Sequence, residues 1–512
     1  MAPTDRGDQI RPELSTRLTA WLCSNEVSLA AALGIILAVR LWISPLPSSF
    51  WMDETGTVWS VTGGIKDVIA HWQADFPVMP LHSLLTWAWS RVAGMSEVAL
   101  RLLSVIEVSL AALLLWKAAR RLTGRVTAAY TLLLLASLSH VSFAAADARP
   151  YALALLCAAW VFFETVRFIQ TGRTVHAVLQ GIALGLAMNS HYGYGVLIAP
   201  LAVYILVAHR RGWSQMRPAL LISPLVALLI FAPAVPLFVE VARTQRTHSF
   251  ASQPSWTDLA AVLIPPRWIV SAVVGLGAAW MLARRKMPAN ETADTRVTAL
   301  LGIWTVVPVL ILFVYSLLSG TAVMVPRYLL SQTPGIVLLG AYMMSRLRAA
   351  ELRITVAVVL FAISIAGSGK ALWTRHATDD WRAASAAMNR LRNHDVSLPV
   401  LMGSPFIESI HMPMPVPPGV QDYLLAPLKP YPIDGPVTLL PVEMNSRNAE
   451  YVHAVFESAA GSNRFLVLIP SASGLTRWVY GRFDREFAIT EIQPDPIVLL
   501  LERRGARAAI LR

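Results

Sequence analysis

The chain of 512 residues is 55% hydrophobic and only 14% charged, and its mean hydropathy is +0.54. Soluble domains carry about 25% charged residues, so this composition excludes an ordinary soluble globular protein and indicates a polytopic membrane protein. The formal net charge of +12 does not indicate nucleic-acid binding, because the arginines stand in short clusters between apolar runs, as in cytoplasmic loops. Cys23 and Cys157 lie far apart in or near apolar segments, and no disulfide is expected.

Residues 1–26 are polar and mixed in charge, and we expect them to form a cytoplasmic N-terminal segment. The apolar run that follows has no convincing small-residue cleavage site and is expected to be a retained first span. A span needs about 20 apolar residues, and this length predicts about eleven of them, near 27–43, 97–116, 126–146, 151–168, 174–190, 193–208, 218–239, 268–283, 297–318, 326–345 and 353–369. The amphipathic stretch 77–94 is short for a span and is expected to lie at the membrane surface or to pack into the bundle.

The distribution of basic residues predicts the orientation of these spans. With the N-terminus inside, every cytoplasmic loop carries a basic cluster: 117–125, Arg167 with Arg173, 209–217, 284–286 and 345–353. The opposite loops hold fewer basic residues, so the alternation satisfies the positive-inside rule. The predicted domains are therefore the segment 1–26, a transmembrane domain 27–369 with a first external loop at 44–96, and an external domain 370–512.

The composition changes after residue 370. Pro-rich loops alternate there with short apolar runs typical of strands, at 464–470 and 496–502. Helical patterns cover 379–394 and 448–460. These features predict a small α/β domain on the external face.

Unusual polar residues also collect on the predicted external side. They are Asp53 and Glu54 in the first external loop, followed in later turns by Asp147, Arg149, Tyr151, Asn189, His191, Tyr192, Arg327 and Tyr328. An ionisable group at bilayer depth costs about 2.5–3.5 kcal/mol on insertion scales, so such residues usually border a cavity or find partners. Their convergence on one face indicates a charged reaction centre.

Structural interpretations of the same residues stay open. The Asp53–Glu54 pair can cap a helix of the loop, and Arg149 and Arg327 can extend their charged ends to the membrane interface. His191 can be a core histidine with satisfied hydrogen bonds. Two loop arginines, Arg243 and Arg246, are expected to be solvated.

The order of several short motifs resembles a known family. These motifs are the Asp-Glu pair after the first span, "MPLHSLL" (79–85), "SEVALRLLS" (96–104), "ADARPYALAL" (146–155), "SHYG" (190–193), "PRYLL" (326–330) and "DDWRAA" (379–384). The chain resembles bacterial GT-C-type, polyprenyl-phosphate-dependent glycosyltransferases of the protein O-mannosyltransferase-like group (glycosyltransferase family 39), which includes aminoarabinose transferases. The resemblance covers roughly residues 27–345, and "DWRAA" recurs at the start of the external domain of bacterial members.

The resemblance implies transfer of a sugar, a hexose or pentose, from a polyprenyl-phosphate donor to an acceptor on the outer face of the bacterial inner membrane. The acceptor is then a glycan, lipid or protein of the cell envelope. The roles of the matching family residues imply that Asp53 is the general base, that Glu54 positions it, and that Asp147 orients the acceptor or a metal. Arg327, Tyr328 and Arg149 bind the donor phosphate, while His191, Tyr151 and Tyr192 are weaker substrate-binding candidates.

Elementary chemistry supports the same assignment. A carboxylate can accept the acceptor's hydroxyl proton, and arginine matches the charge of a phosphate leaving group. Adjacent carboxylates in an irregular loop tend to diverge, which favours inversion over a double displacement. A divalent metal is not required, although Asp53 and Asp147 are the candidate ligands if one binds. A transporter or flippase for a lipid-linked or anionic solute is the alternative, and a scaffold for envelope enzymes a third interpretation.

Overall fold

A computed structural model of the chain describes residues 20–72, 78–213, 219–244, 251–283, 293–470 and 473–505. Residues 214–217 of the predicted basic cluster 209–217, the predicted cluster at 284–286 and Arg246 lie outside the described residues. The chain divides into two compact units. The first, which we call the helical unit, comprises Met1–Pro45, Ser104–Val235 and Ala251–Thr374, and the second, the α/β unit, comprises Leu46–Leu103, Pro236–Phe250 and Arg375–Arg512.

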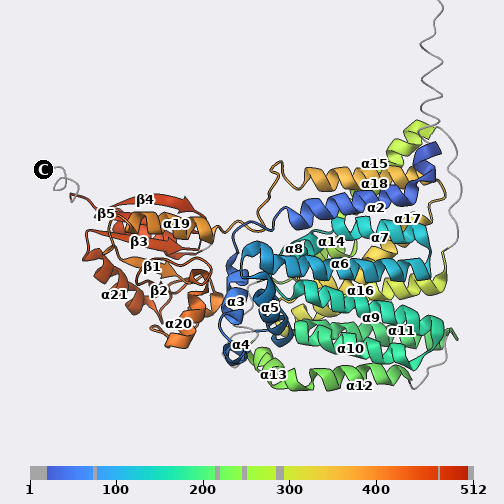
Figure 1. Cartoon of the computed structure of the whole chain (residues 1–512), viewed down its shortest axis with the longest axis horizontal. Coiled ribbons are helices and arrows are strands. Elements are labelled where there is room, and N and C mark those ends of the chain that lie inside the picture. The colour runs from blue at the N-terminus through green and yellow to red at the C-terminus, as the bar shows by residue number, and fades with distance from the viewer. Residues whose placement is uncertain are drawn as a thin grey trace, which may run out of the picture. The chain divides into compact units, whose positions relative to one another are not determined.

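The helical unit is a bundle whose long helices lie side by side (Figure 1). Its elements, in chain order, are α2 (Glu26–Ala38), the π-helical turn η1 (Val39–Ile43), α7 (Arg125–Ser137), α8 (Ser139–Ala145), α9 (Tyr151–Thr171), α10 (Thr174–Ser190), η2 (Tyr192–Leu197), α11 (Ile198–Arg210), α12 (Ala219–Phe231), η3 (Ala232–Ala234), α14 (Trp256–Leu263), α15 (Pro266–Ala283), α16 (Thr295–Ser319), η5 (Leu329–Gln332), α17 (Thr333–Ser345) and α18 (Ala350–Ala366). Two further helices, α6 (Glu97–Leu122) and α13 (Val235–Thr244), each run from one unit into the other.

Each of the eleven ranges predicted to span the membrane overlaps a helix. Among the described residues, six helices are long and apolar enough to cross a membrane, and two bent pairs raise this number to eight. The helices α10, α17 and α18, of 17, 13 and 17 residues, are shorter. The range 126–146, predicted as one span, is broken: α7 and α8 meet at 76°, because Leu138 between them has an extended backbone with φ −78° and ψ 120°.

Two glycines allow α10 and α12 to pack closely. A Cβ atom on Gly181 would lie 2.5 Å from the carbonyl oxygen of Ser223, and one on Gly185 would lie 2.7 Å from the Cβ of Ile230. The spacing of four residues places both glycines on the same face of α10. Small residues at this spacing let two helix backbones approach each other inside a membrane, where packing replaces the hydrophobic effect.

The α/β unit contains a five-stranded sheet with the order β2-β1-β3-β5-β4. Its strands are β1 (Val400–Gly403), β2 (Thr438–Leu440), β3 (Arg464–Ile469), β4 (Phe487–Pro494) and β5 (Ile497–Arg503). β1 pairs in parallel with β2 and β3, whereas β5 is antiparallel to β3 and β4. The connecting helices are α19 (Trp381–Arg392), α20 (Pro418–Leu424), α21 (Ala449–Ala460) and α22 (Leu475–Phe483), with short 3-10 turns η6 (Ile407–Ile410) and η7 (Ala426–Leu428). The sequence predicted two of these strands and two of these helices.

The central strand β3 is buried on both faces, which explains its uninterrupted apolar sequence. On one face, Phe465 lies against Phe456 of α21 and Phe483 of α22, with ring centroids 6.3 and 6.0 Å away. These side chains belong to one apolar core that joins the sheet to both helices. α19 packs against β4 and β5.

The first predicted external loop also belongs to the α/β unit. It forms α3 (Met52–Val61), α4 (Ile65–Trp72) and α5 (Pro80–Ala93). Trp59 of α3 is buried in an apolar cluster with Phe406 and Tyr423, and its Nε1–H donates to Asp422 Oδ2 at 2.9 Å. The loop and the C-terminal residues therefore share one core, while the domain limits expected from the sequence stay a prediction.

We expect Gly181→Ala to destabilise the helical unit by about 1–3 kcal/mol, because the added methyl group meets backbone atoms of α12. Gly302→Ala on α16 is the matched control, since a Cβ there has no atom within 4 Å. Reaction of the buried Cys157 thiol with a fluorescent maleimide during heating, in a Cys23→Ser background, reports unfolding. Equal midpoints for the two glycine variants would contradict the close approach of α10 and α12.

Candidate active site

The acidic pair stands at the N-terminus of α3. Asp53 and Glu54 occupy the first turn of this helix, where the helix dipole stabilises negative charge. Asp53 is half-buried and Glu54 is fully buried. The Glu54 carboxylate accepts a hydrogen bond from the Trp51 backbone N–H at 3.2 Å and so caps the helix. The capping interpretation therefore applies to Glu54.

The strongest contact of Glu54 is a buried ion pair with Arg101 of α6. Arg101 Nε donates to Glu54 Oε1 at 2.7 Å, and Arg101 Nη2 donates to Glu54 Oε2 at 2.5 Å. Both side chains are 0% exposed. Arg101 also donates to the carbonyl oxygens of Leu46, Ser48 and Ser49 at 2.9, 2.6 and 2.9 Å. One guanidinium thus binds Glu54 and the chain segment that leads into α3.

The C-terminal residues stabilise the same segment through a second polar cluster. The Phe50 backbone N–H donates to the Tyr431 hydroxyl at 2.8 Å, and this hydroxyl donates to Glu97 Oε1 at 2.6 Å. Arg382 of α19 donates to the same Glu97 oxygen at 2.6 Å and to the carbonyl of Pro47 at 2.9 Å. Burial, and next the bond to Glu97, raises the pKa of Tyr431, which therefore stays a neutral donor.

The helical unit contains a separate cluster around His191. The His191 ring lies 4.6 Å from that of Tyr328, 5.8 Å from Tyr151 and 5.8 Å from Tyr194, measured between ring centroids. The guanidinium of Arg327 lies 5.9 Å from the centre of the Tyr151 ring and 5.8 Å from that of Tyr328. Residues from three segments of the chain therefore meet at one cationic and aromatic group.

His191 is neutral in this environment. Burial, followed by the charges of Arg327 and Arg149, lowers the pKa of His191 to about 3. Its Nδ1 accepts a hydrogen bond from the Gly193 backbone N–H at 3.2 Å, which leaves the ring proton on Nε2. A neutral histidine adds a hydrogen-bond donor without competing with the arginines for positive charge.

The remaining candidates lie on the segments that flank this cluster. Asp147 is fully buried in the turn between α8 and α9, and its backbone carbonyl accepts a hydrogen bond from Ser104 Oγ at 2.6 Å. Arg149 lies in the same turn. Tyr192 is buried and its ring packs against Phe231 of α12, with centroids 6.0 Å apart.

The structure groups the sequence-predicted residues into two sets. Asp53 and Glu54 belong to the α/β unit, whereas Asp147, Arg149, Tyr151, His191, Tyr192, Arg327 and Tyr328 belong to the helical unit. The loop arginine Arg243 is exposed and pairs with Glu240 at 3.7 Å, as expected for a solvated residue. A metal shared by Asp53 and Asp147 stays a prediction.

The comparisons with known proteins agree with this architecture. Residues 75–236 match a family described as dolichyl-phosphate-mannose-protein mannosyltransferase. The structure of ArnT from Cupriavidus metallidurans in the apo state is similar over 93% of this chain and 98% of that chain, with a TM-score of 0.56 at 14% sequence identity. The structure of the same protein bound to undecaprenyl phosphate gives 0.55 at 14% identity, over 95% and 99% of the two chains.

The chain has the GT-C glycosyltransferase fold. The resemblance to the protein O-mannosyltransferase-like group is thereby confirmed, as is the expected fold class of a helical membrane protein with a small α/β domain. An apo oligosaccharyltransferase from Archaeoglobus fulgidus has a lower TM-score of 0.49 at 11% identity, over 86% of this chain and 69% of that chain. No curated protein sequence matches the chain.

Sequence reasoning missed the residues that position α3 in this GT-C protein. Arg101 stood inside the quoted motif "SEVALRLLS", and an arginine near the start of a predicted span was a usable signal. Glu97, Arg382 and Tyr431 had no comparable signal, because their contacts join segments about 330 residues apart.

We expect the two adjacent carboxylates to differ sharply in their effect on stability. Glu54→Gln leaves the Arg101 charge unpaired in a buried place, which typically costs about 3–5 kcal/mol. Asp53→Asn, the control at the neighbouring half-buried position, should shift the unfolding midpoint little. Thermal unfolding of both purified proteins measures the difference, and a stable Glu54→Gln protein would show that the ion pair is not structural.

Proposed function

We propose that the chain is an integral membrane glycosyltransferase that moves a sugar from a polyprenyl-phosphate donor to a cell-envelope acceptor, with inversion. The matched family is described as a mannosyltransferase that uses a dolichyl-phosphate-linked sugar, and the similar ArnT structure binds undecaprenyl phosphate. These similarities support a lipid-phosphate donor. The reaction is proposed to take place on the outer face of the inner membrane.

The observation that carries the proposal is the different environment of the two adjacent carboxylates. Both oxygens of Glu54 accept hydrogen bonds from Arg101, so Glu54 acts as a positioning residue. Asp53 is half-buried on the same helical turn and is proposed as the general base. Double displacement with retention requires a nucleophilic carboxylate about 5 Å from the second one. Since Arg101 binds Glu54, the pair supports inversion.

In the proposed reaction, the acceptor hydroxyl oxygen attacks the anomeric carbon while its proton passes to Asp53. The bond between the anomeric carbon and the phosphate oxygen breaks, and polyprenyl phosphate leaves with the electron pair. Negative charge grows on the leaving oxygen, and charge-assisted hydrogen bonds from arginine stabilise it. Arg327 and Arg149 are proposed for this role, with Tyr328 and Tyr151 lining the donor and Asp147 orienting the acceptor.

Asp53→Asn tests the base directly. The substitution keeps the shape of the side chain but removes the proton acceptor, so single-turnover sugar transfer should fall by about 10²–10⁴. Binding of undecaprenyl phosphate, followed by native mass spectrometry, should stay close to wild type. Transfer at near the wild-type rate would remove Asp53 from the mechanism, and transport of the lipid-linked sugar without bond cleavage by the wild type would favour the flippase alternative.

Arg327→Ala tests the donor side. Loss of a charged partner of the phosphate should weaken undecaprenyl phosphate binding by about tenfold or more and also slow transfer. Arg243→Ala, which removes an exposed arginine paired with Glu240, is the matched control and should bind normally. If both variants bind the lipid equally well, Arg327 does not contact the phosphate.

The proposed orientation places the N-terminus in the cytoplasm and residues 370–512 outside. A reporter fused after Gly212 should then lie in the cytoplasm, and one fused after Val400 outside, because basic clusters mark the cytoplasmic loops. Paired alkaline phosphatase and green fluorescent protein fusions distinguish the two compartments. Cytoplasmic signals at both positions would overturn the orientation.

A further inference from the structure

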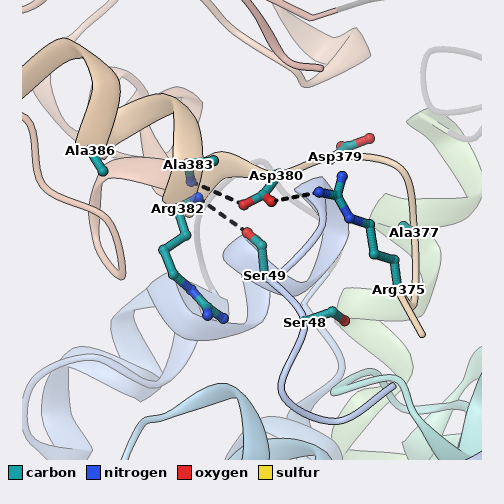
Figure 2. Close-up of a pocket in the computed structure, with 9 residues that line it drawn as sticks. All are labelled: Ser48, Ser49, Arg375, Ala377, Asp379, Asp380, Arg382, Ala383 and Ala386. Carbon is teal, nitrogen blue, oxygen red and sulfur yellow. Dashed lines mark hydrogen bonds and ion pairs between the residues drawn. The ribbon is translucent and has the colours of Figure 1, made fainter. Parts of the chain in front are cut away.

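A half-open pocket lies within the α/β unit, where the segment leading into α3 meets the start of α19. Its volume is about 280 Å³, and its lining residues are Ser48, Ser49, Arg375, Ala377, Asp379, Asp380, Arg382, Ala383 and Ala386 (Figure 2). This volume lies just below the range of about 300–1,000 Å³ found for small-molecule sites. It suits one small polar unit rather than a folded partner.

The polar groups of the cavity are fixed by contacts within the unit. The Asp380 carboxylate accepts from the Ala383 backbone N–H at 3.0 Å and pairs with Arg375 at 3.2 Å, as Figure 2 shows. Ser49 Oγ accepts from the Arg382 backbone N–H at 3.2 Å. Groups held in place before binding lose little conformational freedom when a ligand arrives.

The composition of the lining selects the class of ligand. Arg382 pairs with Glu97 and Arg375 pairs with Asp380, so most of the charge at the lining is neutralised and it favours neither a phosphate nor a metal cation. Hydroxyl groups accept hydrogen bonds from a guanidinium and donate them to a carboxylate, and a sugar ring carries several hydroxyls side by side. Ala383 and Ala386, spaced one turn apart on α19, add a small apolar wall that suits the C–H groups of such a ring.

The cavity is also within reach of the proposed base. Asp53 stands four positions after Ser49 in the sequence, and a chain of this length spans at most about 14 Å. A saccharide in the cavity would therefore lie no more than a few sugar units from Asp53.

We propose that this cavity binds one saccharide unit of the acceptor, which makes the acceptor a glycan or glycolipid. The inference rests on the proposed function, since it names the acceptor class of the same transfer. Arg375 and Asp380 bind the hydroxyl groups, and Ser48 and Ser49 line the side toward α3.

Direct binding tests the proposal without any transfer assay. The probes are methyl glycosides of neutral hexoses and N-acetylhexosamines, measured by saturation-transfer difference NMR on the full-length protein in a detergent without a sugar head group. Ala386→Phe places a ring in the cavity and should weaken binding by about tenfold or more, as should Arg375→Met. The controls are Arg390→Phe, one turn further along α19, and Arg447→Met, and both positions are exposed.

The outcomes separate this inference from the function on which it rests. Saccharide binding that both cavity variants lose and both controls keep supports it, as does a matching rise in the acceptor KM with an unchanged kcat. Binding of inorganic phosphate in place of every glycoside would overturn it, and so would equal binding by Ala386→Phe and Arg390→Phe. If the wild type transfers sugar but these variants keep its acceptor KM, the inference fails and the proposed function stands. If the wild type binds glycosides but transfers no sugar, the proposed function fails and the binding site stands.

Discussion

The geometry of the acidic helix depends on one buried guanidinium. Arg101 donates hydrogen bonds to Glu54 and to three backbone carbonyls of residues 46–49. The carbonyl oxygens accept hydrogen bonds from the guanidinium and so offset part of its desolvation free energy. A buried ion pair alone rarely repays that free energy. A lysine has a compact ammonium group with three donors, so it cannot reproduce the planar fork that reaches both partners. The ion pair therefore explains why a chain this apolar carries two adjacent carboxylates: one maintains the local structure, and the other is proposed for chemistry.

The contacts of Glu97 extend this constraint to the C-terminal part of the chain. A single carboxylate oxygen accepts from Tyr431 and from Arg382, and these residues bind Pro47, within the segment that Arg101 contacts, and Phe50, directly after it. The C-terminal part of the α/β unit thus supplies side chains that bind the segment leading into α3. A family resemblance confined to membrane-spanning residues would not reveal that dependence.

The sequence predicted what depends on local pattern. Apolar length located every long helix, and the strands β3 and β5 followed from uninterrupted apolar runs. The bend at Leu138 was not predicted, because nothing in an apolar run marks where a helix breaks. The contact of Arg101 was not predicted, because its partner Glu54 is 47 residues away. The contact of Tyr431 with Glu97 was not predicted either, because the two residues are 334 positions apart. Residues with an unusual local signature, such as Asp53, Asp147 and Arg327, could be proposed as site residues from sequence alone, and that assignment stays a prediction, whereas side chains defined by distant partners could not be identified.

The α/β unit is built from segments that are far apart in the sequence, and this has a consequence for its synthesis. Residues 46–103 leave the ribosome about 270 residues before residue 375 does, although both belong to one core. At about 5–20 residues per second, this interval lasts roughly 15–55 s. The Arg101–Glu54 pair lies wholly within the early segment, so it can form during that time, before the strands of the sheet exist. The apolar face of Trp59 cannot be buried until Phe406 and Tyr423 follow, so the nascent first loop keeps this apolar surface exposed throughout that interval.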